Sequence, residues 1–456
     1  MKKLVWCSFA ALLGSVQAQA WTLSKVISIA GERDPTFQAQ LARTNADQEA
    51  VAQVRSRLMP QVSFEASREY QDRALPNTGD NFVETGSSVG WYQSDENVLR
   101  VDQVLFDSVL AAEIREAAAG TKVALASLEE ARLSLVDEVI NDYIETLKQA
   151  ETVALLDQEI LSVRQALKLA WSRYLDGTAR ETDALRAEGR VLSVVNQRSG
   201  AAAEFQAQLD LLGQKIGVAP QFLRGLDPQS GILQAYDFDA ELAELNSTAL
   251  RIPRLQQEVR QASLNVQQRS YYPTIDLSYA TERTDGTQRK VTSGGVNTRA
   301  DVRRENTATI TFSWDLYTGG NRTSRVREAE ANVVAAEFDV EAAERQFRFD
   351  LAGAQRRARL LETTQKSLKV ALDAFEKVAV EQRAAYQSGL IDIATVLQAE
   401  SDLAAARAEF VIAKYDAILA QTELRRLSGG LDEAFFQEID DLFSKKITVA
   451  EVLASR

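Results

Sequence analysis

The sequence predicts an α+β chain in which one plan of long helices and paired strands is written twice. Three observations predict it. The stretch YLDGTARETDALRAE at 174–188 recurs as YQSGLIDIATVLQAE at 386–400, a shift of 212 positions. Short runs with a period of two, which are typical of strands, come in two pairs. Helical runs without a single proline extend over 108–174 and 321–386.

Residues 1–20, MKKLVWCSFAALLGSVQAQA, have the pattern of a secretory signal peptide. Two lysines precede an apolar run, and Ala18-Gln19-Ala20 has the small-x-small form of a cleavage site. The apolar run has about half of the roughly 20 residues that a membrane-spanning helix needs, so a membrane anchor is the weaker interpretation. Because the only cysteine, Cys7, lies here, we expect neither disulfides nor a thiol nucleophile in the mature chain.

The first copy of the plan is expected over residues 21–217. The helical composition ends at Pro60, because proline cannot continue a helix. Apolar residues such as Val62 and Phe64 then alternate with polar residues such as Ser63 and Glu65, which predicts a strand. A polar loop from 71 to 88 is expected to form an exposed tip. In order, we expect a helix, two strands, a long helix and a shorter helix at residues 24–58, 61–70, 97–106, 108–174 and 183–217.

The second copy is expected over residues 239–429, with Pro273 leading its first strand as Pro60 leads the strand of the first copy. A second polar loop from 283 to 304 is again expected to form an exposed tip. The expected helix, two strands, long helix and shorter helix lie at residues 239–272, 274–283, 305–315, 321–386 and 395–429. The connecting segment 218–238 and the C-terminal segment 430–456 are expected to pack together as an equatorial belt.

The long helices have apolar residues at steps of three and four. In the first of them the stripe comprises Leu135, Val139, Tyr143, Leu147, Ala150 and Ala154. At 1.5 Å per residue each long helix would span roughly 100 Å, which is too long for a globular core. Two of the shorter helices placed end to end match that length, so a uniform helical layer is expected.

Composition argues against enzymes and nucleic-acid binding. The chain has 52 basic and 65 acidic residues, a formal net charge of −13 and no histidine. A negative surface repels nucleic acid, and histidine is the usual general base and metal ligand. The sequence shows no glycine-rich phosphate loop, zinc spacing or nucleophile motif. We therefore expect no catalytic, cofactor-binding or metal site.

No segment after Ala20 has the length and apolarity of a spanning helix, so the expected strands decide whether the protein meets a membrane. Strands of about ten residues suffice to cross a bilayer when tilted. Several aromatic residues stand near the strand ends or on the apolar face, namely Trp91, Tyr92, Tyr272, Tyr279 and Trp314. An interfacial girdle and the core of a soluble sheet both account for them.

The chain resembles the TolC family of outer-membrane export channels over most of its length, from about Trp21 to Gly429. The resemblance rests on the proline-led strands LMPQV at 58–62 and YPTIDL at 272–277, the junction LYTGG at 316–320, and the two Tyr-x-x-Gly turns. Each motif is common alone, and the set is specific.

The resemblance implies an α+β membrane protein that acts as a homotrimer. Four strands per chain would close a twelve-stranded barrel in outer-membrane lipid of a Gram-negative bacterium, continuous with a long periplasmic α-helical barrel. Such a duct would passively conduct the substrates of type I protein secretion or multidrug efflux. Its implied partners are a periplasmic adaptor protein and an inner-membrane ABC or proton-driven transporter. The alternative from another class is a soluble periplasmic coiled-coil adaptor or scaffold.

The resemblance also implies that the duplicated turns form the closed periplasmic end of the tunnel, with Tyr174, Gly177 and Gly389 at the helix-hairpin turns. The gating tyrosine of the family matches Tyr386, and the aspartate that it reaches matches Asp183. The family's two acidic rings fall here on Thr395 and Gln398, so they are missing. The nearest acidic residues to those positions are Asp392 and Glu400.

Structural roles compete with gating at these positions. Asp183 also suits the first turn of a helix, where a carboxylate is favoured by the helix dipole. Tyr386 suits hydrophobic packing at a helix end. Glu188 and Glu400 are expected on solvated faces, and glycine at 177 and 389 suits a left-handed residue after a helix.

Overall fold

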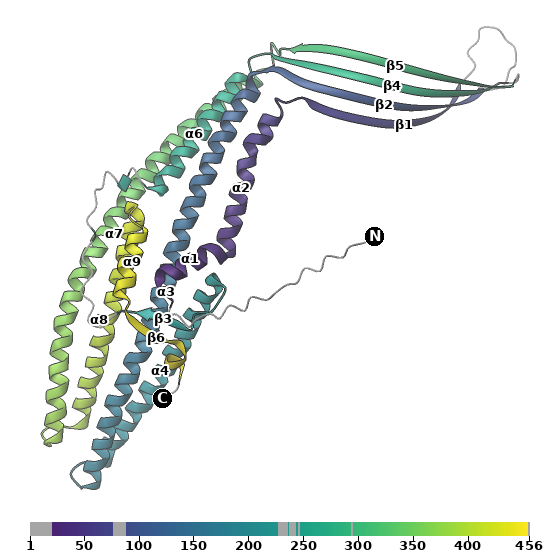
Figure 1. Cartoon of the computed structure of the whole chain (residues 1–456). Coiled ribbons are helices and arrows are strands. Elements are labelled where there is room, and N and C mark those ends of the chain that lie inside the picture. The colour runs from purple at the N-terminus through teal and green to yellow at the C-terminus, as the bar shows by residue number, and fades with distance from the viewer. Residues whose placement is uncertain are drawn as a thin grey trace. The chain divides into compact units, whose positions relative to one another are not determined.

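The computed structural model describes residues 21–75, 88–226, 236, 243–244, 247–292 and 295–454, so the expected signal peptide lies outside the described residues. The described residues of Met1–Ala42, Ser127–Arg251 and Ala343–Arg456 form one compact unit, which we call the helical unit. Those of Arg43–Ala126 and Ile252–Ala342 form a second, which we call the sheet unit. Figure 1 shows their elements.

Four long strands make the sheet of the sheet unit (Figure 1). They are β1 (Gln61–Leu75), β2 (Ser88–Asp107), β4 (Thr274–Thr292) and β5 (Gly295–Ser313). Their order is β1-β2-β4-β5, and all neighbours are antiparallel. Within the described residues β1 and β5 therefore each have one unpaired edge.

The strands extend well beyond their expected ends, and the expectation of a loop over 283–304 is wrong. β4 runs to Thr292 and β5 begins at Gly295, with Arg283 paired to Arg304 in register. Part of the first expected loop is also strand, and its remainder, 76–87, lies outside the described residues. The physical reason is that the backbone ladder does not depend on side-chain polarity, whereas the alternation used to find the strands ends where the apolar face ends.

The register aligns one apolar face and one polar face across all four strands. Val62, Val101, Tyr279 and Ala308 form one row of the apolar face, and Ser63, Arg100, Ala280 and Thr307 form a row of the other. The apolar face is uncovered in the chain, because Phe64 is 68% exposed and Ile310 is 70% exposed. Tyr279 and Trp314 are exposed as well, so they do not pack into a core of this chain.

The N-terminal helical run is two helices, α1 (Leu23–Arg33) and α2 (Pro35–Ser56), where the sequence pattern predicts one. The break falls at Asp34, because a residue before proline is disfavoured in the helical conformation and proline suits the first helical position. Asp34 ends α1 through its backbone N–H, and its carboxylate accepts the Phe37 N–H at 2.8 Å. Pro35 therefore begins a second helix in this region, in addition to the break at Pro60.

Two pairs of a long and a shorter helix dominate the chain. The long helices are α3 (Ser108–Leu175) and α7 (Asn321–Gln387), of 68 and 67 residues, and the shorter ones are α4 (Glu181–Ile216) and α8 (Ile393–Ser428), of 36 each. Both shorter helices end at a left-handed glycine, Gly217 and Gly429, as helix C-termini often do. A further helix, α6 (Thr248–Arg269), is shorter than the expected 239–272.

The core of the helical unit surrounds the apolar stripe of α3, whose residues Leu135 to Ala150 are buried. Tyr143 is fully buried, and its hydroxyl lies 2.9 Å from the Trp21 carbonyl and accepts the Arg224 N–H at 3.1 Å. Burial raises the pKa of the Tyr143 phenol, so the group stays neutral. Phe443 lies against the rings of both Tyr143 and Tyr415.

The C-terminal residues form a clasp on the helical unit. They comprise α9 (Glu433–Leu442), β6 (Lys445–Thr448) and α10 (Val449–Leu453), and β6 pairs antiparallel with β3 (Phe222–Gly225). The Asp440 carboxylate accepts the Leu23 N–H at 2.7 Å and the Ser24 N–H at 3.2 Å, at the start of α1. Arg198 donates to the carbonyl of Ala454 at 2.7 Å.

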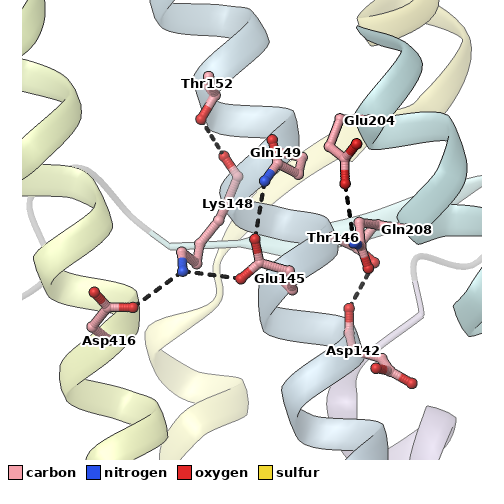
Figure 2. Close-up of polar contacts among 9 residues, drawn as sticks. All are labelled: Asp142, Glu145, Thr146, Lys148, Gln149, Thr152, Glu204, Gln208 and Asp416. Carbon is pink, nitrogen blue, oxygen red and sulfur yellow. Dashed lines mark hydrogen bonds and ion pairs between the residues drawn. The ribbon is translucent and has the colours of Figure 1, made fainter. Parts of the chain in front are cut away.

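A polar bridge joins the two long-helix pairs in the middle of the helical unit (Figure 2). Lys148 of α3 lies between Glu145 on its own helix, at 2.9 Å, and Asp416 of α8, at 3.1 Å. Burial lowers the pKa of the Lys148 ammonium, but hydrogen bonds to these two carboxylates outweigh it and raise the pKa overall. Lys148 is therefore charged and ties α3 to α8.

Candidate functional site at the helix-hairpin tips

The same turn reverses the chain at the end of each long helix. Gly177 and Gly389 have φ of +72° and +80°, a left-handed conformation that favours glycine. In the first turn the Thr178 N–H donates to Arg173 O at 2.8 Å, and in the second the Leu390 N–H donates to Ala385 O at 3.0 Å. Each bond satisfies one of the last carbonyls of its helix.

The four helix ends share one apolar cluster, which we call the tip cluster. Its buried members are Ala170 of α3, Ala184 and Ala187 of α4, Tyr386 of α7, and Ile393 and Val396 of α8. Tyr386 is 2% exposed, so its ring is the large side chain of the cluster. A cavity of about 330 Å³ lies beside it, lined in part by Lys168, Ser172 and Arg383.

Arg173, in the last turn of α3, reaches across to the last turn of α7. Its guanidinium carbon lies 4.7 Å from the centre of the Tyr386 ring, a cation–π distance. Its Nη1 donates to the backbone carbonyl of Tyr386 at 2.5 Å. One side chain of the first hairpin therefore holds both the ring and the main chain of the second.

The hydroxyl of Tyr386 is buried and has no hydrogen-bond partner among the described residues. Asp183, at the start of α4, is half-buried and near enough to influence the phenol. Burial raises the pKa of Tyr386, Arg173 lowers it, and Asp183 raises it further. The structure thus brings Asp183 and Tyr386 into one neighbourhood without a hydrogen bond from the tyrosine hydroxyl.

Asp392 begins α8. Its carboxylate accepts the Thr395 N–H at 3.0 Å and the Thr395 hydroxyl at 2.6 Å, which makes it the N-cap. These hydrogen bonds lower the pKa of Asp392. Gln398 is exposed and donates to Asp402 at 2.7 Å.

The expectation that Glu400 lies on a solvated face is wrong. Glu400 is 4% exposed, and Arg383 of α7 donates to its carboxylate from Nε at 3.0 Å. Glu188, at the equivalent place in the first copy, is exposed as expected. Arg383 is the reason for the difference, because its equivalent 212 positions earlier is Trp171, which offers no charge to a carboxylate.

A second polar contact crosses between the hairpins. Arg190 of α4 donates to Glu159 of α3 at 2.6 Å and to the Ser401 hydroxyl of α8 at 2.9 Å. Sequence comparison missed Arg173, Arg190 and Arg383. It kept only positions that agree between the copies, and the equivalents of these three are Ala385, Asp402 and Trp171.

The very ends of the hairpins are apolar and exposed. Tyr174, at the place that Tyr386 takes in the second copy, is 36% exposed and packs edge-on against Trp171. Leu175 and Leu390 are 79% and 78% exposed.

Among the described residues no group of three or more histidine, cysteine or acidic side chains is placed to hold a metal ion. In the same part of the chain, every helix is too short or too polar to cross a membrane.

A sheet with one lipid-type apolar face, joined in the chain to helices of nearly 70 residues, defines an outer-membrane channel protein. The outer membrane efflux protein family matches residues 26–218 and 240–430, and the chain belongs to this family. The resemblance inferred from the sequence is thereby confirmed, as are the fold class and the outer-membrane location.

The chain is 26% identical to the outer membrane protein TolC of Vibrio cholerae, over 96% of this chain and 98% of that protein. It is 23% identical to the alkaline protease secretion protein AprF of Pseudomonas aeruginosa, over 95% of this chain and 90% of that protein. Its fold matches the outer-membrane channel MtrE of Neisseria gonorrhoeae with a TM-score of 0.73 at 18% identity, covering 92% and 94% of the chains. These three are described as an outer membrane protein, a secretion protein and an outer-membrane channel, and none favours a soluble scaffold.

Proposed function

We propose that the protein is the passive outer-membrane duct of a three-part export system. An inner-membrane transporter, of the ABC or proton-driven type, would supply the energy. A periplasmic adaptor would join that transporter to the hairpin tips. The family and the relative named for secretion support the duct. We find no nucleotide-binding motif in this sequence, so the energy would come from the transporter, and cargo specificity would reside there as well.

The observation that carries the proposal is the incomplete sheet. Its apolar face is exposed, and within the described residues β1 and β5 each leave one edge unpaired. Unpaired backbone groups in lipid cost several kcal/mol each, roughly, so four strands alone do not span a membrane. Three chains joined edge to edge would close twelve strands, a homotrimer that removes every edge and lines the lumen with the polar face.

We propose that the gate of this duct lies at the hairpin tips of the two repeats. The hairpin of the second repeat would be the part that moves. Tyr386 lies in the tip cluster and Asp183 lies beside it. Asp392, Thr395 and Gln398 start α8 with exposed polar groups, and Glu400 ties α8 to α7 through Arg383. Opening would separate the second hairpin from the first, and the exposed Leu175 and Leu390 would meet the adaptor.

Purification and bilayer recording test the duct. The protein extracted from outer membranes in mild detergent is expected to have the mass of three chains and to give discrete conductance steps in planar lipid bilayers. Crosslinking in cells before extraction is expected to co-purify an adaptor and an inner-membrane transporter. A single-chain particle that remains in solution without detergent and gives no conductance would overturn the proposal.

A further inference from the structure

The last turn of α7 has no basic residue of its own. Its final carbonyls carry the negative end of the helix dipole, which a nearby cation stabilises. Arg173 supplies that cation from the other hairpin, with Nη1 2.5 Å from the Tyr386 carbonyl. The end of α7 is thus completed by a residue of α3.

Gly389 makes room for this contact. A Cβ at position 389 would lie 3.2 Å from Nη2 of Arg173, tighter than nine in ten real contacts of a Cβ, so the guanidinium would have to shift by a few tenths of an ångström. The left-handed φ of +80° independently favours glycine here. Glycine therefore suits the backbone of this turn and leaves the guanidinium undisturbed.

Arg173 contacts the ring and the carbonyl of Tyr386 with clear geometry, and it also lies near enough to the hydroxyl to lower the phenol pKa. The hydroxyl is buried without a partner among the described residues, and the guanidinium stacks on the ring at 4.7 Å. Burial raises the pKa of the phenol, so the ring is neutral and its attraction to Arg173 is of the cation–π kind. Removing the hydroxyl leaves the contacts of Arg173 with the ring and the carbonyl in place.

This contact has no counterpart from the second hairpin to the first. The place equivalent to Arg173 in the second copy is Ala385, which has no charge to offer. The equivalent of Tyr386 is Tyr174, whose ring is exposed and packs on its neighbour Trp171. The first hairpin therefore holds the second, and nothing equivalent is returned from Ala385.

We propose that Arg173 is the positioning residue that latches the second hairpin closed, through the ring and the carbonyl of Tyr386, and that opening requires this contact to break. This inference rests on the proposed channel function. It assigns the closing interaction to a residue outside the expected Tyr386 and Asp183 pair. It also makes the tyrosine ring, and not its hydroxyl, the group that matters.

Single-channel recording on the full-length purified protein tests the latch with four variants. Arg173→Gln and Tyr386→Leu are expected to raise the conductance several-fold, because each removes the stacked pair. Tyr386→Phe is expected to keep the wild-type conductance, because the ring and carbonyl remain. Arg173→Lys is expected to have a conductance between those of the wild type and Arg173→Gln, because an ammonium can reach the carbonyl but lacks the planar guanidinium.

Arg180→Gln is the matched control, with the same change of charge in the same hairpin at an exposed arginine. It is expected to behave as wild type. Equal particle mass in detergent shows that each variant assembles. Wild-type conductance in an assembled Arg173→Gln variant, or opening by Tyr386→Phe, would overturn the latch. Absence of conductance in the wild type and every variant would instead contradict the channel function itself.

Discussion

Asp392 shows how one exposed side chain starts a helix at the tip. Its carboxylate accepts both the N–H and the hydroxyl of Thr395, and these bonds lower its pKa. A lowered folded pKa means that the cap contributes stability above the ordinary aspartate pKa of about 3.9, and loses it as the pH falls through the lower folded value.

Asp392→Ala is therefore expected to loosen the first turn of α8 at pH 7, by about 0.5–2 kcal/mol for the loss of an N-cap. Amide hydrogen exchange of peptides that cover residues 393–398 measures the effect. The difference from wild type is expected to shrink below about pH 4. An equal difference at pH 3 and pH 7 would show that the carboxylate charge is not what caps the helix.

Equivalent residues of the two copies have different environments, which is the main lesson at this scale. Tyr174 is exposed where Tyr386 is buried, and Glu188 is exposed where Glu400 is paired with Arg383. Sequence comparison found these positions because the residue types agree. It did not find their roles, because burial depends on neighbours such as Arg173 and Arg383 whose identity differs between the copies.

At the scale of elements, the sheet separates two faces with opposite requirements. Ile310 lies on the apolar face opposite Leu277, and Thr311 lies on the polar face opposite Asp276. Successive residues of one strand therefore face lipid and water in turn.

Ile310→Arg is expected to destabilise the membrane sheet by up to roughly 2–4 kcal/mol, the cost of a lipid-facing arginine at the bilayer midplane, which decreases toward the interfaces. Thr311→Arg is the control, and it is expected to be tolerated because it faces water and Asp276. The amount of folded trimer in the outer membrane, compared on semi-native gels, measures both. Similar losses for both variants would show that the apolar face does not contact lipid.

The strands were located by their alternating apolar residues, and their full length was not. β4 and β5 stay paired beyond Thr281 and Asn306, for example at Arg283 with Arg304. In this part of the two strands most side chains on both faces are polar. Periodicity reports only where one face must be buried or must meet lipid. It is silent where both faces meet water, although the backbone pairing continues.

At the scale of the molecule, the N-terminal helix and the C-terminal segment depend on each other. Asp440, more than 400 positions away, accepts the first two N–H groups of α1 beside the N-cap Thr22, and Arg198 donates to the Ala454 carbonyl. Residues 430–454 complete the helical unit in this way. Such a contact needs both ends of the chain to be in place.

Asp440→Ala is expected to loosen the first turn of α1 by about 1.5–3 kcal/mol, the usual contribution of a hydrogen bond to a charged group, because the Leu23 and Ser24 N–H groups lose their acceptor. The neighbouring Asp441→Ala is the control, because Asp441 is exposed. Hydrogen exchange of peptides from residues 21–30 is expected to speed up in the first variant and not in the second. Unchanged exchange in Asp440→Ala would contradict the clasp.

The helix and strand classes, the two copies of the plan and the family could be predicted from the sequence alone. Those features come from periodicity, from proline and glycine positions and from motifs, which are local properties of the chain. The contacts of the folded chain were needed to show that Arg173 reaches Tyr386, that Glu400 is buried and that Asp440 binds the first N–H groups of α1. These contacts join residues far apart in sequence, and their energies depend on burial and geometry that no local pattern records.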